Sequence, residues 1–474
     1  MYKMNIRLLD ENKITQIYDT YMPHDFAKGE IKPLSRILEL CKLGKYFCYG
    51  VYENSNSDTE ELVAYGFLVT SETRNAVLLD YFAVSAPIRG KGYGSVCFAM
   101  LREKVKEERL GTLILEVENP RFGSDEAEKR LRRKRIAFYI RNGMTLTHLR
   151  IFLYDVEYLV MTSDVTCLFD AASQIYDVYR VLLKPEKLQS KVKITTNIRC
   201  IVSDLDRTLL NEAGVLSAKT KAVIRQAEML GIQTIVASGR AYDTLPQEVK
   251  EMEQLSDTIT SNGAVICHKG TCIRQRVLEE TCVKQIWQIY QGVKNTGKVA
   301  LEVFAEGKAY CDRAYYDFPE KYGSGEAKDY VRNTRNVIED METFVAEHID
   351  VLENVDYISA DEALREKLMA RLSEVSDISV TSSMEHLIEI AAPDVSKGEA
   401  LLWVLEQKGI EPEECVAFGD ADNDISMLTL VGIGIAVANA APNVREAANY
   451  ITESNREDGV AMVCEKIMEK NDVM

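Results

Sequence analysis

Two aspartates stand directly after a short apolar stretch that we expect to be a strand, residues 200–203. One residue separates Asp204 from Asp206, so a strand end could turn both carboxylates toward one place, with the hydroxyl of Thr208 beside them. One carboxylate could attack phosphorus, and the other could protonate the leaving oxygen and then activate water. A magnesium ion would screen their repulsion from a phosphate. The spacing indicates phosphoryl transfer, and the stretch alone leaves an acidic turn as the alternative.

Polar residues also follow other apolar stretches in the second half of the chain. Ser238 and Gly239 follow residues 234–237, Asn262 follows residues 257–260, and Asp420 follows residues 415–418. Helical spacing of apolar residues separates these short strands, which predicts a doubly wound parallel sheet. Because ligands bind at the carboxyl ends of such strands, we expect the polar residues to meet at one edge.

This half of the chain resembles the haloacid dehalogenase superfamily, and within it the Cof-like phosphatases. The motifs that carry the resemblance are residues 204–210, 237–240, 261–264, 395–398 and 419–424. The resemblance implies that Asp204 is the nucleophile, that Asp206 is the acid and base, and that Lys397 is the clamp on the aspartyl phosphate. It implies a second group of residues that bind the substrate or its phosphate: Thr208, Ser238, Gly239, Asn262 and Asn423. It also implies Mg²⁺ binding by Asp204, the backbone carbonyl of Asp206, Asp420 and Asp424.

One position departs from the pattern of the superfamily. Arg207 stands where glycine is usual, so the turn must accept a side chain and gains a cation near the site. More than a hundred residues lie between Ala264 and Lys397, which is more than the core needs. We expect them to form an inserted α/β cap that selects the leaving group. Glu385 and His386 are candidate cap contacts, with a satisfied or surface histidine as the more frequent alternative.

The first third of the chain predicts a mixed sheet, with strands at residues 46–52, 62–70, 76–84 and 113–117. A glycine-rich turn, residues 89–94, follows the third of these and precedes a helix. Such a turn points backbone N–H groups and the positive end of a helix at one place, which suits a pyrophosphate. A turn that only joins strand to helix is the alternative, and the glycine spacing is not that of a dinucleotide-binding Rossmann motif.

The turn resembles the acetyl-CoA loop of the GNAT acetyltransferases, through Arg89, Gly92 and Gly94, and residues 137–144 resemble the second signature of that family. The resemblance implies that Tyr139 protonates the leaving CoA thiolate, while aromatic packing is the alternative for this residue. Asp80, Glu116 and Glu118 are all open as the base for an amine acceptor of unknown identity. The implied cofactor-binding residues are Val84, Arg89, Gly90, Lys91, Gly92, Tyr93 and Gly94.

These patterns predict an α/β protein: a GNAT-like mixed-sheet domain followed by a Rossmann-like core with an inserted α/β cap. We expect the domains to span residues 1–165 (GNAT-like), 166–196 (helical linker), 197–280 with 387–474 (core) and 281–386 (cap). The expected function is a Mg²⁺-dependent phosphatase of small phosphorylated metabolites fused to an acetyl-CoA-dependent N-acetyltransferase. A non-catalytic acetyl-CoA sensor domain and a phosphotransferase or phosphomutase are the alternatives.

Composition limits the partners of the chain. Its 474 residues carry a net charge of -17, which argues against nucleic acid or an anionic membrane as the main partner. The 11 cysteines show no metal-binding spacing and read as reduced thiols. We find no signal-peptide pattern and no apolar run that approaches a membrane span, so we expect a cytoplasmic protein. The oligomeric state does not follow from the sequence.

Overall fold

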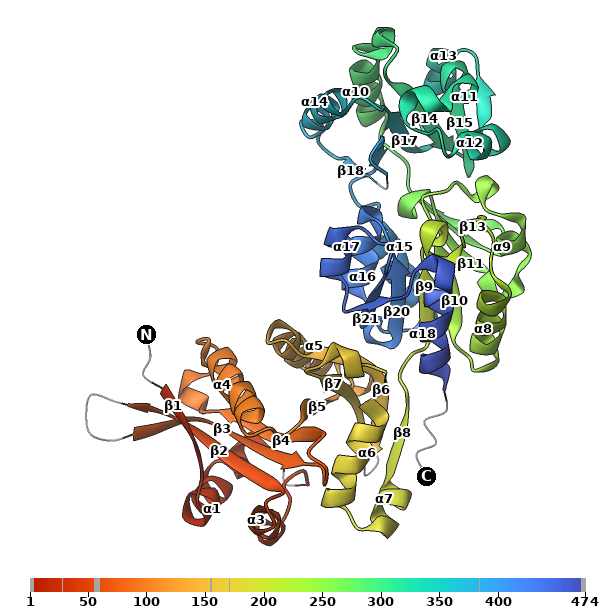
Figure 1. Ribbon diagram of the computed structural model, residues 1–474. Coiled ribbons are helices and arrows are strands. Elements are labelled where there is room, and N and C mark those ends of the chain that lie inside the picture. Colours follow the sequence, from red (N-terminus) through yellow and green to blue (C-terminus); the bar gives the residue numbers. More distant parts are fainter. Residues whose placement is uncertain are drawn as a thin grey trace. The chain divides into compact units, whose positions relative to one another are not determined.

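The computed structural model describes residues 4–27, 29–54, 60–153, 156–169, 171–382 and 384–469. The chain forms two compact units that divide between Asn197 and Ile198 (Figure 1). We call them the amino-terminal unit and the carboxy-terminal unit and describe each by itself.

The amino-terminal unit is built on one eight-stranded sheet in the order β1-β2-β3-β4-β5-β7-β6-β8. The strands are β1 (Met4–Leu8), β2 (Tyr46–Asn54), β3 (Glu60–Thr70), β4 (Ala76–Val84), β5 (Thr112–Glu118), β6 (Thr145–Leu153), β7 (Val156–Thr162) and β8 (Val192–Thr196). The helices are α1 (Glu11–Thr20), α2 (Met22–Asp25), α3 (Leu34–Lys42), α4 (Tyr93–Glu107), α5 (Glu126–Arg141), α6 (Ala171–Leu182) and α7 (Pro185–Lys191).

Strands β4 and β5 form a parallel pair within this otherwise antiparallel sheet. Their pairing runs from Ala76 opposite Thr112 to Leu79 opposite Leu115 and goes no further. Asp80 and Glu116 are therefore the first residues beyond the paired segment on each strand. The sheet holds these two carboxylates where the strands separate.

The segment predicted as a helical linker, residues 166–196, belongs to the amino-terminal unit instead. Helix α6 buries Ile175, Val178 and Tyr179 in the same apolar core as α1 and α3, and β8 extends the sheet by pairing with β6. The apolar residues at helical spacing are thus a core-facing stripe rather than the face of a docked linker.

The carboxy-terminal unit has a core sheet in the order β13-β12-β11-β10-β9-β20-β21-β22. The strands are β9 (Cys200–Ser203), β10 (Gln233–Ala237), β11 (Asp257–Thr260), β12 (Val265–His268), β13 (Thr271–Gln275), β20 (Cys415–Gly419), β21 (Ile433–Val437) and β22 (Tyr450–Thr452), and the helices are α8 (Ala218–Met229), α9 (Gln247–Glu251), α15 (Lys397–Lys408), α16 (Ile425–Leu430), α17 (Pro442–Ala447) and α18 (Gly459–Met468).

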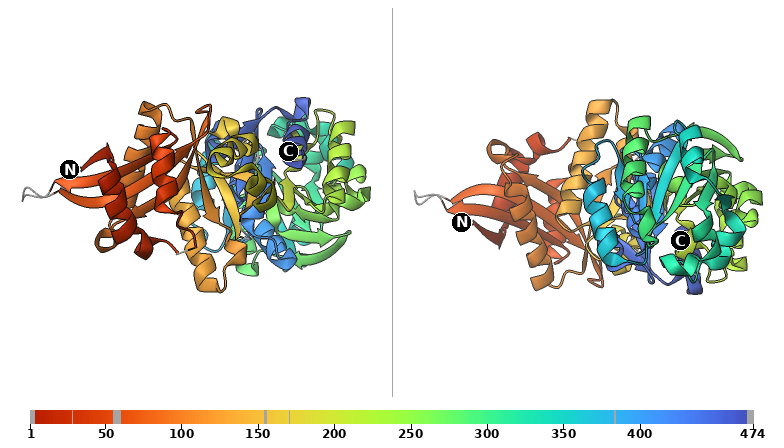
Figure 2. Two further views of the ribbon diagram at one scale, coloured as in Figure 1. Left: turned by 90° about the horizontal axis from the view of Figure 1, so that it is seen from below. Right: turned by 90° about the horizontal axis from the view of Figure 1, so that it is seen from above.

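All strands from β11 through β22 in this order run parallel, and helices flank the sheet: α15 and α16 pack together, as do α8 and α18 (Figures 1 and 2). This is the predicted doubly wound α/β architecture. The helices cover apolar strands, because β9, β10 and β20 are almost entirely buried.

The cap follows β13 and contains a six-stranded sheet in the order β16-β15-β14-β17-β19-β18. Its strands are β14 (Ala300–Ala305), β15 (Lys308–Asp312), β16 (Asn336–Ile338), β17 (Leu352–Ile358), β18 (Ser379–Thr381) and β19 (Leu387–Ala391), and its helices are α10 (Glu280–Gln291), α11 (Arg313–Asp317), α12 (Lys328–Thr334), α13 (Met341–Glu347) and α14 (Glu362–Leu372).

The predicted end of the cap at residue 386 is too early, because β19 pairs with β17 and β18 inside the cap sheet. The buried residues of β19 pack into the apolar core of the cap, so this strand cannot belong to the core sheet. Leu278, which precedes the predicted start of the cap at residue 281, also packs into this apolar core, and α10 starts at Glu280.

Candidate active site

Two neighbouring parallel strands deliver the acidic residues of the carboxy-terminal unit to one place. Strand β9 pairs with β20, and Asp204 and Asp420 follow their carboxyl ends. Asp424 directly precedes α16 and lies four residues after Asp420. All three carboxylates are buried, and each offers an oxygen that lies within 4.8 Å of the others. The topology thus brings together the three side chains that the motifs suggested for a metal.

A buried lysine joins two of these carboxylates. Lys397, the first residue of α15, is 1% exposed. Its Nζ lies 2.6 Å from Oδ1 of Asp204 and 2.7 Å from Oδ1 of Asp424. Burial alone would lower the pKa of Lys397, but the two carboxylates raise it above its usual value. The ammonium group therefore stays charged at the centre of the acidic group.

Burial also acts on the carboxylates. It raises the pKa of Asp204 well above its usual value; Lys397 opposes this shift, and Asp424 and Asp420 add to it. Burial and Asp424 raise the pKa of Asp420 to about 6, while Arg207 and the Thr208 hydroxyl lower it. One lysine thus leaves the three buried carboxylates short of positive charge.

The predicted phosphate-binding residues surround this group. Oγ1 of Thr208 donates to Oδ1 of Asp420 at 3.0 Å. Ser238 is buried at the end of β10, where its Oγ accepts the N–H of Arg240 at 3.2 Å. Nδ2 of Asn423 donates to Oδ1 of Asn262 at 2.9 Å, so these two amides face each other. Gly239 lines a cavity together with Asn423, and a Cβ at Gly239 would lie 3.1 Å from Oδ1 of Asn262.

Asp206 points away from the three clustered carboxylates. Arg240 holds its carboxylate with two hydrogen bonds, Nε to Oδ2 at 2.7 Å and Nη2 to Oδ1 at 2.5 Å. The guanidinium of Arg240 also packs over the ring of Tyr330 on cap helix α12, 4.5 Å from its centroid. Tyr330 lies in the cap outside every motif, so no sequence pattern points to it.

Arg207 occupies a left-handed conformation with φ of 60°. Its side chain is 59% exposed and its Nε lies 3.6 Å from Oδ2 of Asp420. Its carbonyl oxygen accepts Nδ2 of Asn439 at 2.8 Å. The turn therefore accepts a side chain where glycine would be unstrained, and this side chain places a guanidinium beside Asp420.

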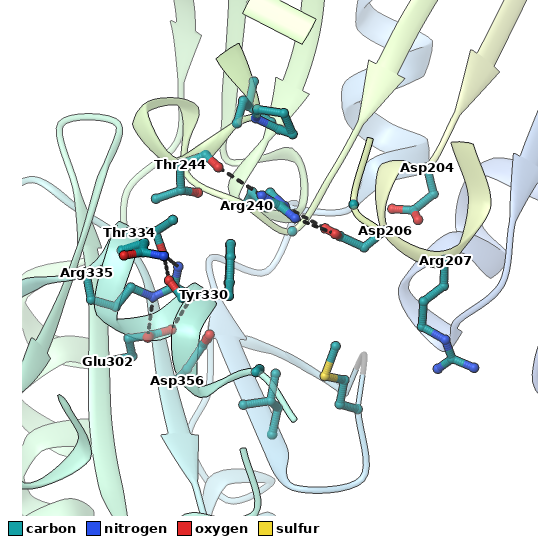
Figure 3. Close-up of a pocket in the computed structure, with 18 of the residues that line it drawn as sticks. Asp204, Asp206, Arg207, Arg240, Thr244, Glu302, Tyr330, Thr334, Arg335 and Asp356 are labelled. Carbon is teal, nitrogen blue, oxygen red and sulfur yellow. Dashed lines mark hydrogen bonds and ion pairs between the residues drawn. The ribbon is translucent and has the colours of Figure 1, made fainter. Parts of the chain in front are cut away.

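A cavity of about 1200 Å³ extends from these residues to the cap. Asp204, Asp206 and Arg240 line its core side, and Tyr330 and Arg335 line its cap side (Figure 3). Glu385 and His386, the predicted cap contacts, are not among its lining residues in the described part of the chain, although their neighbours Met384 and Leu387 are.

A second cavity, of about 650 Å³, lies in the amino-terminal unit. Val84, Arg89, Gly94 and Tyr139 line it, whereas residues 90–93 of the predicted loop do not. Nε of Arg89 donates to the carbonyl of Val84 at 2.8 Å. Within the loop, Gly90 and Gly92 have φ of 79° and 88°, which L side chains rarely adopt. Gly92 directly precedes helix α4.

Tyr139 both packs and faces this cavity. Its ring meets the rings of Phe98 and Phe138, with centroids 5.3 and 5.1 Å apart, and burial raises its pKa to about 12. The phenol is therefore neutral near pH 7 and able to donate a proton.

The three candidate bases have different partners. Asp80 accepts from Lys32 at 2.6 Å and from the Tyr46 hydroxyl. Glu118 pairs with Arg135 at 2.8 Å and Arg132 at 3.3 Å.

Glu116 instead accepts from the hydroxyl of Tyr179 on α6. Burial raises its pKa to about 7, and the Tyr179 hydrogen bond opposes that shift. Glu116 also lines a neighbouring cavity of about 670 Å³ with Tyr179 and Leu182. Sequence reasoning missed Tyr179, because it placed α6 in a linker.

None of the described helices is long and apolar enough to cross a membrane.

Comparison with known proteins identifies both units. Residues 12–131 match the family model of the acetyltransferase (GNAT) family, so the amino-terminal unit contains a GNAT domain. A 5-amino-6-(5-phospho-D-ribitylamino)uracil phosphatase of Bacillus subtilis is 27% identical over 266 residues, which cover 56% of this chain and 94% of that protein. Phosphatase YwpJ of the same organism is 27% identical over 294 residues, covering 57% of this chain and 100% of that protein.

A solved haloacid dehalogenase-like hydrolase from B. subtilis is 28% identical, with a TM-score of 0.49, and covers 56% of this chain and 99% of that one. Residues 201–463 match the family model described as haloacid dehalogenase-like hydrolase. These residues make up more than half of the chain. The chain therefore belongs to the haloacid dehalogenase-like hydrolase family.

Proposed function

We propose that the carboxy-terminal unit is a Mg²⁺-dependent phosphatase of small phosphorylated metabolites in which Asp204 is the nucleophile. The observation that carries the proposal is the buried group of Asp204, Asp420 and Asp424 with Lys397 between two of its members. It sits at the carboxyl ends of parallel strands and opens into a cavity that the cap covers. This is where an open α/β sheet binds its ligand.

The donor set fits a magnesium ion. All three side chains offer carboxylate oxygens, the ligands that this hard cation prefers. The raised pKa of Asp420, to about 6, reflects buried negative charge that a divalent cation would neutralise. When bound, Mg²⁺ would offset the charge of the carboxylates and the phosphate and polarise a phosphoryl oxygen.

The residues of the chain divide the reaction into two steps. In the first, a carboxylate oxygen of Asp204 forms a bond to phosphorus while the bond to the leaving oxygen breaks, and Asp206 gives that oxygen a proton. In the second, Asp206 takes a proton from water, whose oxygen attacks phosphorus and frees Asp204 and inorganic phosphate. Arg240 orients Asp206 for both transfers, and Lys397 holds Asp204 in place.

The names of relatives guide the choice of substrates to test. Three Bacillus subtilis relatives with 26–29% identity are named 5-amino-6-(5-phospho-D-ribitylamino)uracil phosphatases. We include this ester in a wider panel of phosphate monoesters, because identity at this level supports the reaction class more strongly than the leaving group. An alcohol acceptor added to the assay separates a phosphatase, which releases phosphate, from a phosphotransferase or phosphomutase, which makes a new ester.

The test is phosphate release from this panel by the intact protein, with Mg²⁺ and after its removal with a chelator. Asp204→Asn should abolish release, and removal of Mg²⁺ should suppress it reversibly. Asp422→Asn is the matched control, since Asp422 is exposed and its carboxylate hydrogen-bonds only to Asn443 among the described residues. Undiminished turnover by Asp204→Asn would overturn the assignment.

We propose further that the amino-terminal unit binds acetyl-CoA and transfers the acetyl group to an amine. Tyr139 and Glu116 support this, because they line one cavity with Arg89 and Gly94 of the predicted loop. Glu116 would take the amine proton and Tyr139 would protonate the thiolate. Among the described residues, Glu116 is the candidate base whose carboxylate has no ion pair, whereas Asp80 pairs with Lys32 and Glu118 pairs with Arg135.

Calorimetric titration with acetyl-CoA, followed by an acetyl-transfer screen over primary amines, tests this second activity. Binding with transfer supports the enzyme, whereas binding without transfer to any amine favours an acetyl-CoA sensor.

A further inference from the structure

The cap side of the large cavity carries three carboxylates in a row. Glu302 of β14 lies directly opposite Asp356 of β17, and Asp356 lies directly opposite Glu389 of β19. Residues opposite each other in antiparallel strands share one face of the sheet. All three are at most 5% exposed, and all three line the cavity that also holds Asp204 and Asp206.

The partners of the three carboxylates differ. Arg335 binds Glu302 with two hydrogen bonds, at 2.5 and 3.1 Å, and Nδ2 of Asn262 donates to Oε1 of Glu389 at 2.7 Å. Oδ1 of Asp356 accepts from the side-chain amide of Asn354. Within the described residues, Oδ2 of Asp356 has no hydrogen-bond partner and its carboxylate has no ion pair, although Asp356 is only 3% exposed.

Two guanidinium groups that line the cavity, Arg335 on its cap side and Arg240 on its core side, already have carboxylate partners. Arg335 is bound to Glu302, and Arg240 is bound to Asp206 (Figure 3). Burial raises the pKa of Asp356 well above its usual value; Glu389 and Glu302 add to the shift, and Arg335 and the Asn354 hydrogen bond oppose it. A buried carboxyl group with an open oxygen and too little nearby positive charge would be stabilised by a cation from outside the chain.

We propose that Asp356 binds a protonated amine carried by the alcohol part of the phosphate ester, and so selects aminated substrates. The proposal rests on the proposed phosphatase function and deepens it. An ammonium group offers three N–H donors, which match the open oxygen of Asp356 and the oxygens of the adjacent carboxylates. The preference should disappear when the amine is acetylated, because an amide carries no charge.

Matched phosphate esters test the proposal with the intact protein. The probes are glucosamine 6-phosphate, glucose 6-phosphate and N-acetylglucosamine 6-phosphate, together with the shorter pair 2-aminoethyl phosphate and 2-hydroxyethyl phosphate. We expect kcat/KM to be roughly 10- to 100-fold higher for the amine than for its matched hydroxyl ester, which is the effect of a buried hydrogen bond to a charged group. Asp356→Asn should lower kcat/KM for the amine far more than for the hydroxyl ester, and so remove most of this preference.

Asp350→Asn is the control, because Asp350 is exposed shortly before the same strand. It should keep the wild-type preference. Equal hydrolysis of both members of every pair, or a preference for the hydroxyl esters, overturns the amine subsite and leaves the phosphatase function intact. A preference that Asp356→Asn retains overturns it as well.

Calorimetry with the Asp204→Asn variant separates the subsite from the chemistry. If the wild type hydrolyses no phosphate ester, the phosphatase proposal fails. Binding of the same probes then decides whether Asp356 forms an amine-binding subsite. Tighter binding of the amines by Asp204→Asn, lost in the double variant that also carries Asp356→Asn, supports the amine subsite. Equal binding, or no binding of any probe, overturns it.

Discussion

The two candidate sites of this chain are assembled in different ways. In the carboxy-terminal unit, the acidic residues follow neighbouring parallel strands, so strand order alone brings Asp204 and Asp420 together. In the amino-terminal unit, Glu116 lies where β4 and β5 separate, and a tyrosine from distant α6 holds it. The comparison teaches that sheet topology suffices to collect the residues of the first site, whereas the second depends on side-chain partners far apart in sequence.

The two sites also compensate buried charge differently. The acidic group around Asp204 has a buried lysine at its centre. Among the described residues, the carboxylate of Glu116 hydrogen-bonds only to a tyrosine hydroxyl, and its pKa rises to about 7. We therefore expect the first site to fail when its internal cation is removed, and the second to respond to pH.

The largest effect on stability is expected for Lys397→Met. This change leaves the carboxylates of Asp204 and Asp424 buried without their lysine, which destabilises a protein by about 3–5 kcal/mol. Urea unfolding of the intact protein measures the loss, and added Mg²⁺ should recover part of it. Lys219→Met, which removes an exposed ion pair to Glu465, is the control and should cost less than about 1 kcal/mol. Equal losses of stability in the two variants would show that the buried lysine stabilises the protein no more than an exposed ion pair does.

The next effect is a pH dependence at Glu116. Folding raises its pKa from 4.5 to about 7, so the folded state binds more protons than the unfolded state in this interval. Stability should therefore fall as pH rises from about 4.5 to about 7, by about 3 kcal/mol for this group. Glu116→Gln should remove that fall and be relatively more stable at pH 8 than at pH 5.

Hydrogen exchange in β5 peptides across a urea series reports this effect on the amino-terminal unit. Glu103→Gln, an exposed change on α4, is the control and should leave the wild-type pH profile within about 0.5 kcal/mol. If Glu116→Gln keeps the wild-type pH profile, Glu116 is already ionised in the folded protein at low pH and the contrast between the two sites is lost.

The difference between the two sites also explains how much of the fold and of the site residues the sequence predicts. Alternating apolar strands and helices predict the doubly wound sheet, and polar residues after its strands predict the place of Asp204 and Asp420. Asp356, Tyr330 and Tyr179 belong to no motif, because their importance comes from cross-strand register or from partners distant in the chain. The stripe on α6 predicts a helix but not the core that the helix covers, which is why residues 166–196 read as a linker.

The smallest effect concerns Arg207. Its left-handed backbone conformation costs an L residue about 1–2 kcal/mol, and its exposed ion pair to Asp420 contributes little stabilisation. Arg207→Gly should therefore stabilise the carboxy-terminal unit by up to about 1 kcal/mol, seen as a higher melting temperature. Arg207→Ala keeps the strain and should show no such gain. An equal gain in both variants would trace the effect to loss of the side chain instead.

The most direct test of the account is to trap the phosphorylated enzyme. The intact protein is mixed with a ³²P-labelled phosphate ester that it hydrolyses, quenched in acid within one turnover and digested. We predict that the label resides on the peptide that contains Asp204, that hydroxylamine releases it as expected for an acyl phosphate, and that Asp204→Asn carries none. Turnover with label on another residue, or with the same label in Asp204→Asn, would contradict the assignment of Asp204 as the nucleophile.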